Sequence, residues 1–236
     1  SEPLTGQPAT EETDVWVAFD DDNLYIAARL HDSAPDALVV NDIKKDFKEE
    51  DQDDFEVLLD TFGDRRNGYV FSTNVEGARH DRQVALEGRE VNQSWDAVWD
   101  VRTRRAADGW TAEIRIPFRA LRFDKSGTTT WGINFSRHIR RKNEVDFWSP
   151  VPRAFNLNRI SLAGNLAGLQ TGKAGRDLRI KPYVAANTIR DLGTTARPNP
   201  RYNNAMDVGA DLTAALTPGL TLDVTNLFNE PVSFYR

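Results

Sequence analysis

Carboxylate and aromatic side chains are the residues of this sequence whose types and spacing could do chemistry. The run Glu49–Asp54 places five carboxylates within six residues. Oxygen-rich loops of this kind can hold Ca²⁺, a hard cation that takes six to eight oxygen ligands, although a solvated loop has the same composition. Trp95 lies in a second polar stretch, Ser94–Trp99. Its indole is a candidate ligand platform, with packing in the core as the alternative.

The sequence carries no recognisable catalytic motif. G-x-S-x-G, H-E-x-x-H and a glycine-rich phosphate loop are all missing from it. A glycosidase needs two carboxylates, but among 36 acidic residues a pair is uninformative. The three histidines, His31, His80 and His138, lie on separate segments without metal-ligand spacing. The chain also lacks cysteine, which excludes a thiol nucleophile and a Cys-ligated zinc. We therefore predict that the chain is not an enzyme.

Composition excludes several classes of partner. The net charge is −6, and residues 1–60 carry 18 acidic against 4 basic side chains. The most basic stretch is the short run Arg137–Lys142, so we expect no nucleic-acid partner. Six tryptophans and 39% hydrophobic residues indicate a packed core rather than a disordered chain. No apolar run is long enough for a transmembrane helix.

Residues 1–170 show the alternation of short β-strands. Residues 110–116 place Trp110, Ala112, Ile114 and Ile116 on one face, and the Asp-Gly pair before them predicts a hairpin. We expect further strands at 14–19, 24–30, 55–60, 68–73, 82–86, 99–104, 131–137, 145–148 and 160–169. This spacing predicts an all-β fold, an antiparallel β-sandwich of two sheets. Trp16, Trp110 and Trp131 are expected in its core.

The pattern changes after residue 170. Residues 171–175 have the composition of a linker, and residues 176–236 contain strands of about ten residues with one apolar and one polar face. Such strands are typical of an outer-membrane β-barrel, which needs at least about eight of them, so this segment would supply only part of one. Soluble strands that extend the sandwich are the alternative.

Five segments together resemble a known family. They are residues 14–32 (DVWVAFDDDNLYIAARLHD), 51–60 (DQDDFEVLLD), 109–118 (GWTAEIRIPF), 131–137 (WGINFSR) and 164–170 (GNLAGLQ). Their order and spacing resemble the family 9 carbohydrate-binding module, in the version found at the N-terminus of bacterial outer-membrane proteins with a barrel similar to TonB-dependent receptors. The resemblance implies a jelly-roll-like sandwich, an oligosaccharide or polysaccharide ligand, and a location in the outer membrane or periplasm of a Gram-negative bacterium.

Two departures from the family pattern bear on the organisation of the chain. The family's opening strand has no counterpart, so we expect a sandwich that lacks its first strand. Residues 226–231 (NLFNEP) resemble the last strand of a TonB-dependent receptor rather than the continuation of a first hairpin. We therefore expect a fragment or a shortened gene product.

The resemblance also implies site residues. In family members two tryptophans sandwich the sugar; here Glu50 occupies the place of one, and Phe155 is the nearest equivalent of the other. Glu56 matches a carboxylate that binds sugar hydroxyls. We expect the sugar to stack on Trp148 or Phe155 and to accept or donate hydrogen bonds at Glu56, with Trp95 as a further candidate.

Asp32 follows the second strand, where family members hold structural calcium. The resemblance therefore implies a calcium site at Asp32, with Asp36 or the Asp51–Asp54 cluster, which includes Asp53, as further ligands. Two hypotheses remain for the function. One is a module that captures glycans at the cell envelope, and the other is a structural periplasmic domain that caps or gates a barrel and binds no sugar.

Overall fold

The computed structural model describes residues 1, 6–123, 130–169, 178–191, 201–217, 220–224 and 232–234. The chain divides into two compact units, residues 1–175 and 176–236. Each unit is described by itself below. Among the described residues, no helix is long and apolar enough to cross a bilayer.

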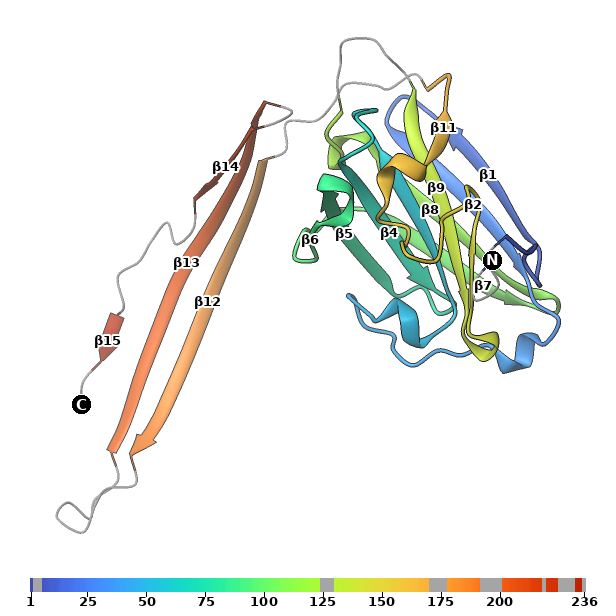
Figure 1. The fold of residues 1–236 in the computed structure, drawn as a ribbon. Helices are drawn as coiled ribbons and strands as arrows, with labels where there is room; N and C mark the ends of the chain where they lie inside the picture. The colour runs from blue at the N-terminus through green and yellow to red at the C-terminus, as the bar shows by residue number, and fades with distance from the viewer. Residues whose placement is uncertain are drawn as a thin grey trace. The chain divides into compact units, whose positions relative to one another are not determined.

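Two antiparallel sheets build the first unit (Figure 1). The first sheet has the order β1-β2-β8-β7, and the second has the order β10-β9-β3-β4-β5-β6, with β11 also paired to β9. The first sheet comprises β1 (Thr13–Phe19), β2 (Asn23–His31), β7 (Asp100–Ala106) and β8 (Gly109–Pro117). The second comprises β3 (Asp54–Asp60), β4 (Gly68–Asn74), β5 (Arg79–Ala85), β6 (Glu90–Asn92), β9 (Trp131–Ile139), β10 (Glu144–Phe147) and β11 (Gly164–Leu166). The predicted all-β, antiparallel fold is confirmed.

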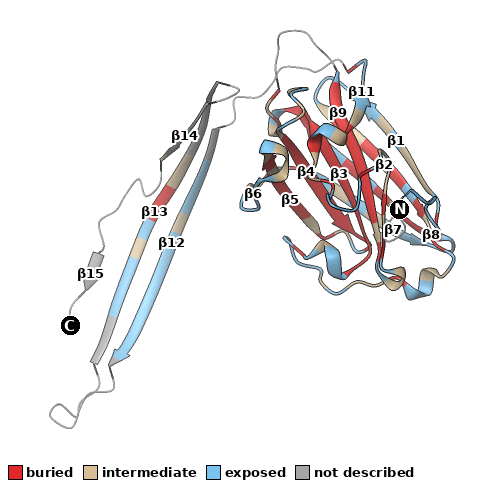
Figure 2. Cartoon of the chain, in the orientation of Figure 1, coloured by how far each residue is buried: buried red, intermediate tan, exposed pale blue. Residues whose placement is uncertain are grey.

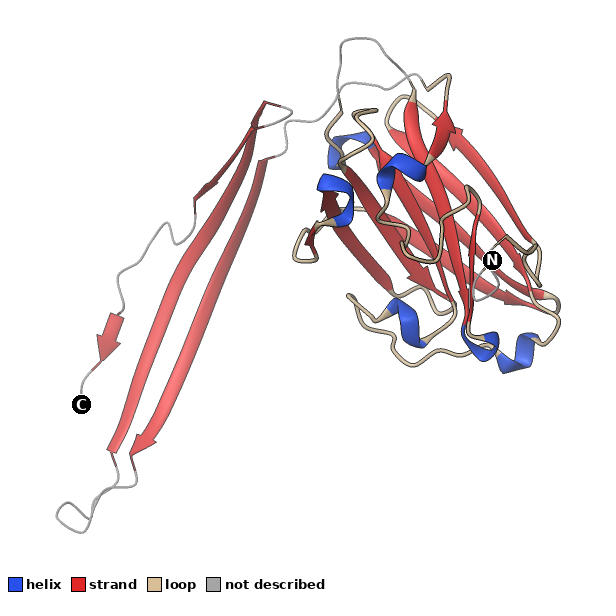
Figure 3. Ribbon diagram, viewed as in Figure 1, coloured by secondary structure: helices blue, strands red, loops and turns tan. Residues whose placement is uncertain are grey.

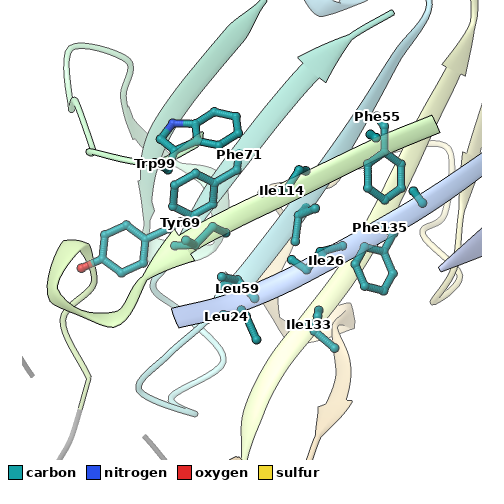
Figure 4. Close-up of a cluster of buried hydrophobic side chains, with 14 of the residues drawn as sticks. Leu24, Ile26, Phe55, Leu59, Tyr69, Phe71, Trp99, Ile114, Ile133 and Phe135 are labelled. Carbon is teal, nitrogen blue, oxygen red and sulfur yellow. The ribbon is translucent and has the colours of Figure 1, made fainter. Parts of the chain in front are cut away.

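Alternation along each strand sends apolar side chains into the space between the sheets. On β3, Phe55, Val57 and Leu59 belong to the main core, together with Ile133 and Phe135 of β9 (Figure 4). The central strands are accordingly buried along their length (Figure 2). Each such side chain, fully buried, contributes roughly 1.5–3 kcal/mol to stability.

The outer face of the second sheet is also covered, in two different ways. Toward one end of the strands lies a small apolar cluster, formed by Leu58, Val70, Val84, Leu157, Ile160 and Ala163. Toward the other end, the outward residues are polar: Glu56, Ser72 and Arg82. Glu56 and Leu58 share one face of β3, so the polar residues and the apolar cluster are neighbours on that face. The cluster includes Leu157, Ile160 and Ala163 and so anchors the loop that borders the polar part.

Three expectations about the elements need correction. Trp16 is 57% exposed, so its predicted place in the core is wrong. It lies on the edge strand β1, where Val15 and Val17 pack on the core and the residue between them faces outward. The strand expected at 160–169 is shorter, since a 3-10 turn occupies Ile160–Leu162 before β11. The short strand β6 was not predicted from the sequence. Figure 3 shows the 3-10 turns as short blue helices between the strands.

The second unit is a sheet built on one long hairpin. It comprises β12 (Leu178–Asp191), β13 (Arg201–Thr217), β14 (Leu220–Val224) and β15 (Val232–Phe234). β12 and β13 pair from Leu178↔Ala214 to Asp191↔Arg201. One face carries exposed apolar side chains at Ile180, Val184, Met206, Val208 and Leu222. The linker prediction for 171–175 and the resemblance at 226–231 lie outside the described residues.

Candidate functional site

A pocket of about 240 Å³ opens on the polar part of the second sheet's outer face. We call it the sheet-face pocket. Its floor comes from β3, β5 and β9, and three segments form its rim, around residues 49–50, 91–93 and 156–158. The lining residues are Glu49, Glu50, Glu56, His80, Arg82, Val91, Gln93, His138, Asn156, Leu157 and Asn158. Charged and amide side chains therefore dominate the pocket.

The Arg82 guanidinium and the Glu56 carboxylate form the centre of this site. Nη2 of Arg82 donates to Oε1 of Glu56 at 2.8 Å. Ser72 Oγ donates to the same oxygen at 2.9 Å, and Ser136 Oγ donates to Oε2 at 2.8 Å. The register brings these groups together, because Glu56 is opposite Ser72 on β4 and opposite Ser136 on β9. Both oxygens of Glu56 thus accept hydrogen bonds from within the protein.

The surroundings keep Glu56 ionised. Burial by itself would raise the pKa of this carboxyl, but the charges of Arg82 and His138, with the hydrogen bonds from Arg82 and Ser136, hold the pKa well below its usual range. A buried charge of this kind is tolerated when it is paired and fully hydrogen-bonded. The floor of the pocket therefore presents a fixed ion pair at neutral pH.

Glu49 extends the ion pair to the rim. Its Oε1 accepts from Nη1 of Arg82 at 2.5 Å and lies 2.6 Å from Nδ1 of His80. The same segment, together with Asp46 and Phe47, lines an adjoining recess that shares Glu49, Glu50, His80 and Gln93 with the pocket. The first part of the acidic run singled out in the sequence, residues 49–51, therefore forms one wall of the pocket and its recess.

A second buried pair lies beside the first. Nδ1 of His138 is 2.8 Å from Oδ1 of Asp54. Burial lowers the pKa of His138, but the charge of Asp54 and the hydrogen bond outweigh it and raise the pKa to about 9. Burial raises the pKa of Asp54 to about 7 despite the imidazolium beside it. His138 also lines the pocket, so it adds a positive charge to the floor.

The structure brings Glu56 to the pocket but places Trp148 elsewhere. The indole of Trp148 contacts Phe135, with ring centroids 5.9 Å apart, and Phe135 belongs to the core side of β9. Ser136, the next residue on β9, points to Glu56 on the opposite face. The two predicted site residues therefore lie on opposite faces of the second sheet, and one sugar ring cannot contact both.

Phe155 and Trp95 occupy different surroundings. Phe155 directly precedes the lining residue Asn156 and is 47% exposed, and the Arg159 guanidinium lies 4.7 Å from its ring centroid. Trp95 is half-buried against the main core, with its ring centroid 4.7 Å from that of Tyr69. The core-packing alternative thus describes Trp95, while Phe155 is exposed next to a lining residue but is not itself among the residues that line the pocket.

Asp32 and Asp53, the predicted calcium ligands, face arginine side chains. Oδ1 of Asp32 accepts from Nη2 of Arg141 at 2.5 Å, and its other oxygen is 3.7 Å from Nη2 of Arg137. Asp53 accepts from the backbone N–H of Val39 at 2.6 Å. Among the described residues, no group of three or more His, Cys, Asp or Glu is arranged to hold a metal. Arginine guanidinium groups lie beside Asp32, while one buried oxygen each of Asp32 and Asp53 has no hydrogen-bond partner among the described residues, so the calcium site stays a prediction.

Three members of the site were not predicted from the sequence. Arg82, His80 and His138 were not predicted to act together, although His80 and Arg82 stand two residues apart on one strand and so share a face. The available signal was a polar residue at an alternating position in each of four buried strands: Glu56, Ser72, Arg82 and Ser136. Strand order was needed to place them side by side.

Comparison with known proteins agrees with this fold. Residues 4–145 match the family described as carbohydrate family 9 binding domain-like. That match spans more than half of the 236 residues, so the chain belongs to this family. The family resemblance read from the sequence is confirmed in this respect. A search of curated proteins gave no match.

Solved structures share the fold at low sequence identity. A family 9 carbohydrate-binding module from Caldicellulosiruptor kristjanssonii in complex with glucose is 17% identical, over 73% of this chain and 82% of that chain, with a TM-score of 0.50. A candidate carbohydrate-binding protein from Bacteroides uniformis ATCC 8492 is 15% identical, over 67% and 78% of the two chains, with a TM-score of 0.54. These likenesses show the fold of the first unit.

Proposed function

We propose that the sheet-face pocket binds a sugar residue of an oligosaccharide or polysaccharide, without catalysis. The observation that supports this most directly is the fixed Arg82–Glu56 ion pair beneath an open pocket. Sugar hydroxyls donate and accept hydrogen bonds, and charged groups make the stronger ones. The family and the glucose complex of a structural relative support the same ligand class.

The pocket itself has room for one or two sugar rings. Its volume of about 240 Å³ is below the roughly 300–1,000 Å³ of sites for drug-sized molecules, and the adjoining recess of about 870 Å³ leaves space for further rings of a longer chain. Both carboxylate oxygens of Glu56 already accept hydrogen bonds within the protein, so its role is to position Arg82. Glu50, Asn156 and Asn158 at the rim are exposed enough to form hydrogen bonds with sugar hydroxyls. Phe155 is the aromatic face we propose for stacking, beside Arg159.

Calorimetric titration of the full chain with glucose, cellobiose and xylobiose tests this function. Saturable binding is expected, with at least about a tenfold loss in Arg82→Gln and Asn158→Ala and no change in the exposed control Glu113→Gln. Circular dichroism establishes that each variant is folded. Binding unaffected by either substitution would remove the pocket from the proposal. A folded chain that binds none of these sugars, nor peptidoglycan fragments, would favour the structural-domain alternative.

A location at the bacterial outer membrane is a further part of the proposal. The exposed apolar side chains on one face of β12 and β13, including Ile180, Val184 and Val208, support it, because such a face is costly in water. Flotation with vesicles of phosphatidylethanolamine and phosphatidylglycerol tests it with the full chain. Cofractionation that is lost in the double variant Ile180→Asp/Val184→Asp is expected. Equal flotation of the variant would contradict the proposal.

A further inference from the structure

The recess that adjoins the sheet-face pocket carries an unbalanced charge. It has a volume of about 870 Å³, and its charged lining residues are four carboxylates, one lysine and one histidine. These residues are Asp46, Lys48, Glu49, Glu50, Asp51 and His80. Because the carboxylates outnumber the cations, the recess favours a ligand with positive charge.

Two of the four carboxylates have no partner in the part of the chain that the structure describes. Glu49 accepts from Nη1 of Arg82 at 2.5 Å and lies 2.6 Å from Nδ1 of His80. The side-chain carboxylates of Glu50 and Asp51, by contrast, make no hydrogen bond or ion pair with the described residues. Both side chains are exposed, and Glu50 lines the pocket as well as the recess. Two charged acceptors beside the pocket are therefore open to a ligand.

The cations in the floor of the pocket are already paired. Each nitrogen of the Arg82 guanidinium donates to a carboxylate or an amide oxygen of the protein. Nδ1 of His138 is 2.8 Å from Oδ1 of Asp54. Each positive charge of the floor is thus accompanied by a carboxylate of the protein, so an anionic sugar would gain no net attraction there.

We propose that the glycan bound by the pocket carries free amino groups, and that the ammonium group of a glucosamine residue lies in the recess beside Glu50 and Asp51. This assignment rests on the proposed function, since one ring occupies the pocket and places its neighbour in the recess. An ammonium group supplies three N–H donors and one positive charge, which suit two carboxylates without partners. A hydroxyl or an acetamide group at the same position of the ring lacks that charge.

Three disaccharides with the same linkage test the proposal by calorimetric titration of the full chain. They are cellobiose, the disaccharide of glucosamine and its N-acetylated form, which differ in a hydroxyl, an ammonium and an acetamide group. At pH 6, in EDTA and low salt, the glucosamine disaccharide should bind at least about fivefold more tightly than the other two, because exposed ion pairs are individually weak and two of them are made. Added salt should reduce this preference, since the carboxylates are exposed.

The protein variants locate the charge that gives the preference. Glu50→Gln/Asp51→Asn keeps the size and polarity of both side chains, so the ratio of the affinities for the glucosamine disaccharide and cellobiose should fall to within about twofold of one. Lys48→Gln removes the lysine of the recess and should raise the ratio. The distant, exposed Glu113→Gln is the control and should leave it unchanged. Circular dichroism establishes that each variant is folded.

The outcomes separate this proposal from the proposed function. Equal binding of the three disaccharides, or tightest binding of the N-acetylated form, would overturn the amino-sugar assignment and leave sugar binding in place. A preference that persists in Glu50→Gln/Asp51→Asn would also overturn it, because the attraction would then come from the net charge of −6. A lower ratio in Lys48→Gln would have the same consequence. A folded chain that binds none of the three would remove the proposed function as well.

Discussion

Nη2 of Arg82 lies 2.8 Å from Oε1 of Glu56, although 26 residues separate them in the chain. They come from β5 and β3, the two strands that flank β4, and Ser72 of β4 stands between them. The ion pair in the floor of the pocket is thus made across a whole strand. Because all of these groups are buried, each depends on the others for hydrogen bonds.

Removing one member of this ion pair should be more harmful than removing both. Glu56→Leu leaves the Arg82 guanidinium buried and short of an acceptor, and we expect a loss of about 3–5 kcal/mol in the free energy of unfolding. The double variant Glu56→Leu/Arg82→Met should recover a large part of that loss. Urea denaturation of the full chain measures both. A double variant less stable than Glu56→Leu would show that packing, and not charge, dominates here.

Alternation predicted much of the fold but could not predict the site. The strand 55–60 was evident from its composition, and its inward face, Phe55, Val57 and Leu59, follows from the same period of two. That Arg82 stands near Glu56 depends on strand order, which local sequence does not encode. Trp16 was assigned to the wrong face of its strand for a related reason. An alternating strand has two candidate faces, and an edge strand need bury only one of them.

The His138–Asp54 pair should make stability fall as pH rises. The pKa of His138 is about 9 in the folded chain against the ordinary value of 6.5, so between these values the folded chain holds a proton that the unfolded chain releases. Its contribution is complete below pH 6.5 and is lost as the pH passes 9. The loss is at most roughly 3 kcal/mol, from the size of the pKa difference.

Urea denaturation at pH 6 and pH 9 measures this effect. His138→Gln should remove most of the difference between the two pH values, because it removes the group that titrates. The raised pKa of Asp54 also makes stability fall as the pH rises, but this fall is complete above about pH 7. A variant with the same pH dependence as the parent chain would assign the titration to another group.

Arg141 should replace a metal ion as the cation beside Asp32. Its guanidinium also donates to Glu11 at 2.7 Å, so it joins two carboxylates that would otherwise repel. We expect neither EDTA nor added CaCl₂ to shift the Tm of the chain by more than about 1 °C. Arg141→Ala should lower the Tm by several degrees, since roughly 1 kcal/mol moves the Tm by about 2–4 °C in a chain of this size. A Tm that falls in EDTA and returns with calcium would instead support the calcium site expected from the family.

Trp16 and Trp131 should respond oppositely to truncation, although both stand in alternating strands. Trp131 is buried against Phe118 and Phe123, so Trp131→Ala removes core contacts and should cost about 3–5 kcal/mol. Trp16 faces outward from β1, so Trp16→Ala should change the free energy of unfolding by less than about 0.5 kcal/mol. Thermal and urea denaturation of the two variants provide the comparison. A large loss in Trp16→Ala would mean that the outer face of β1 is covered in solution, for which concentration-dependent sedimentation gives the check.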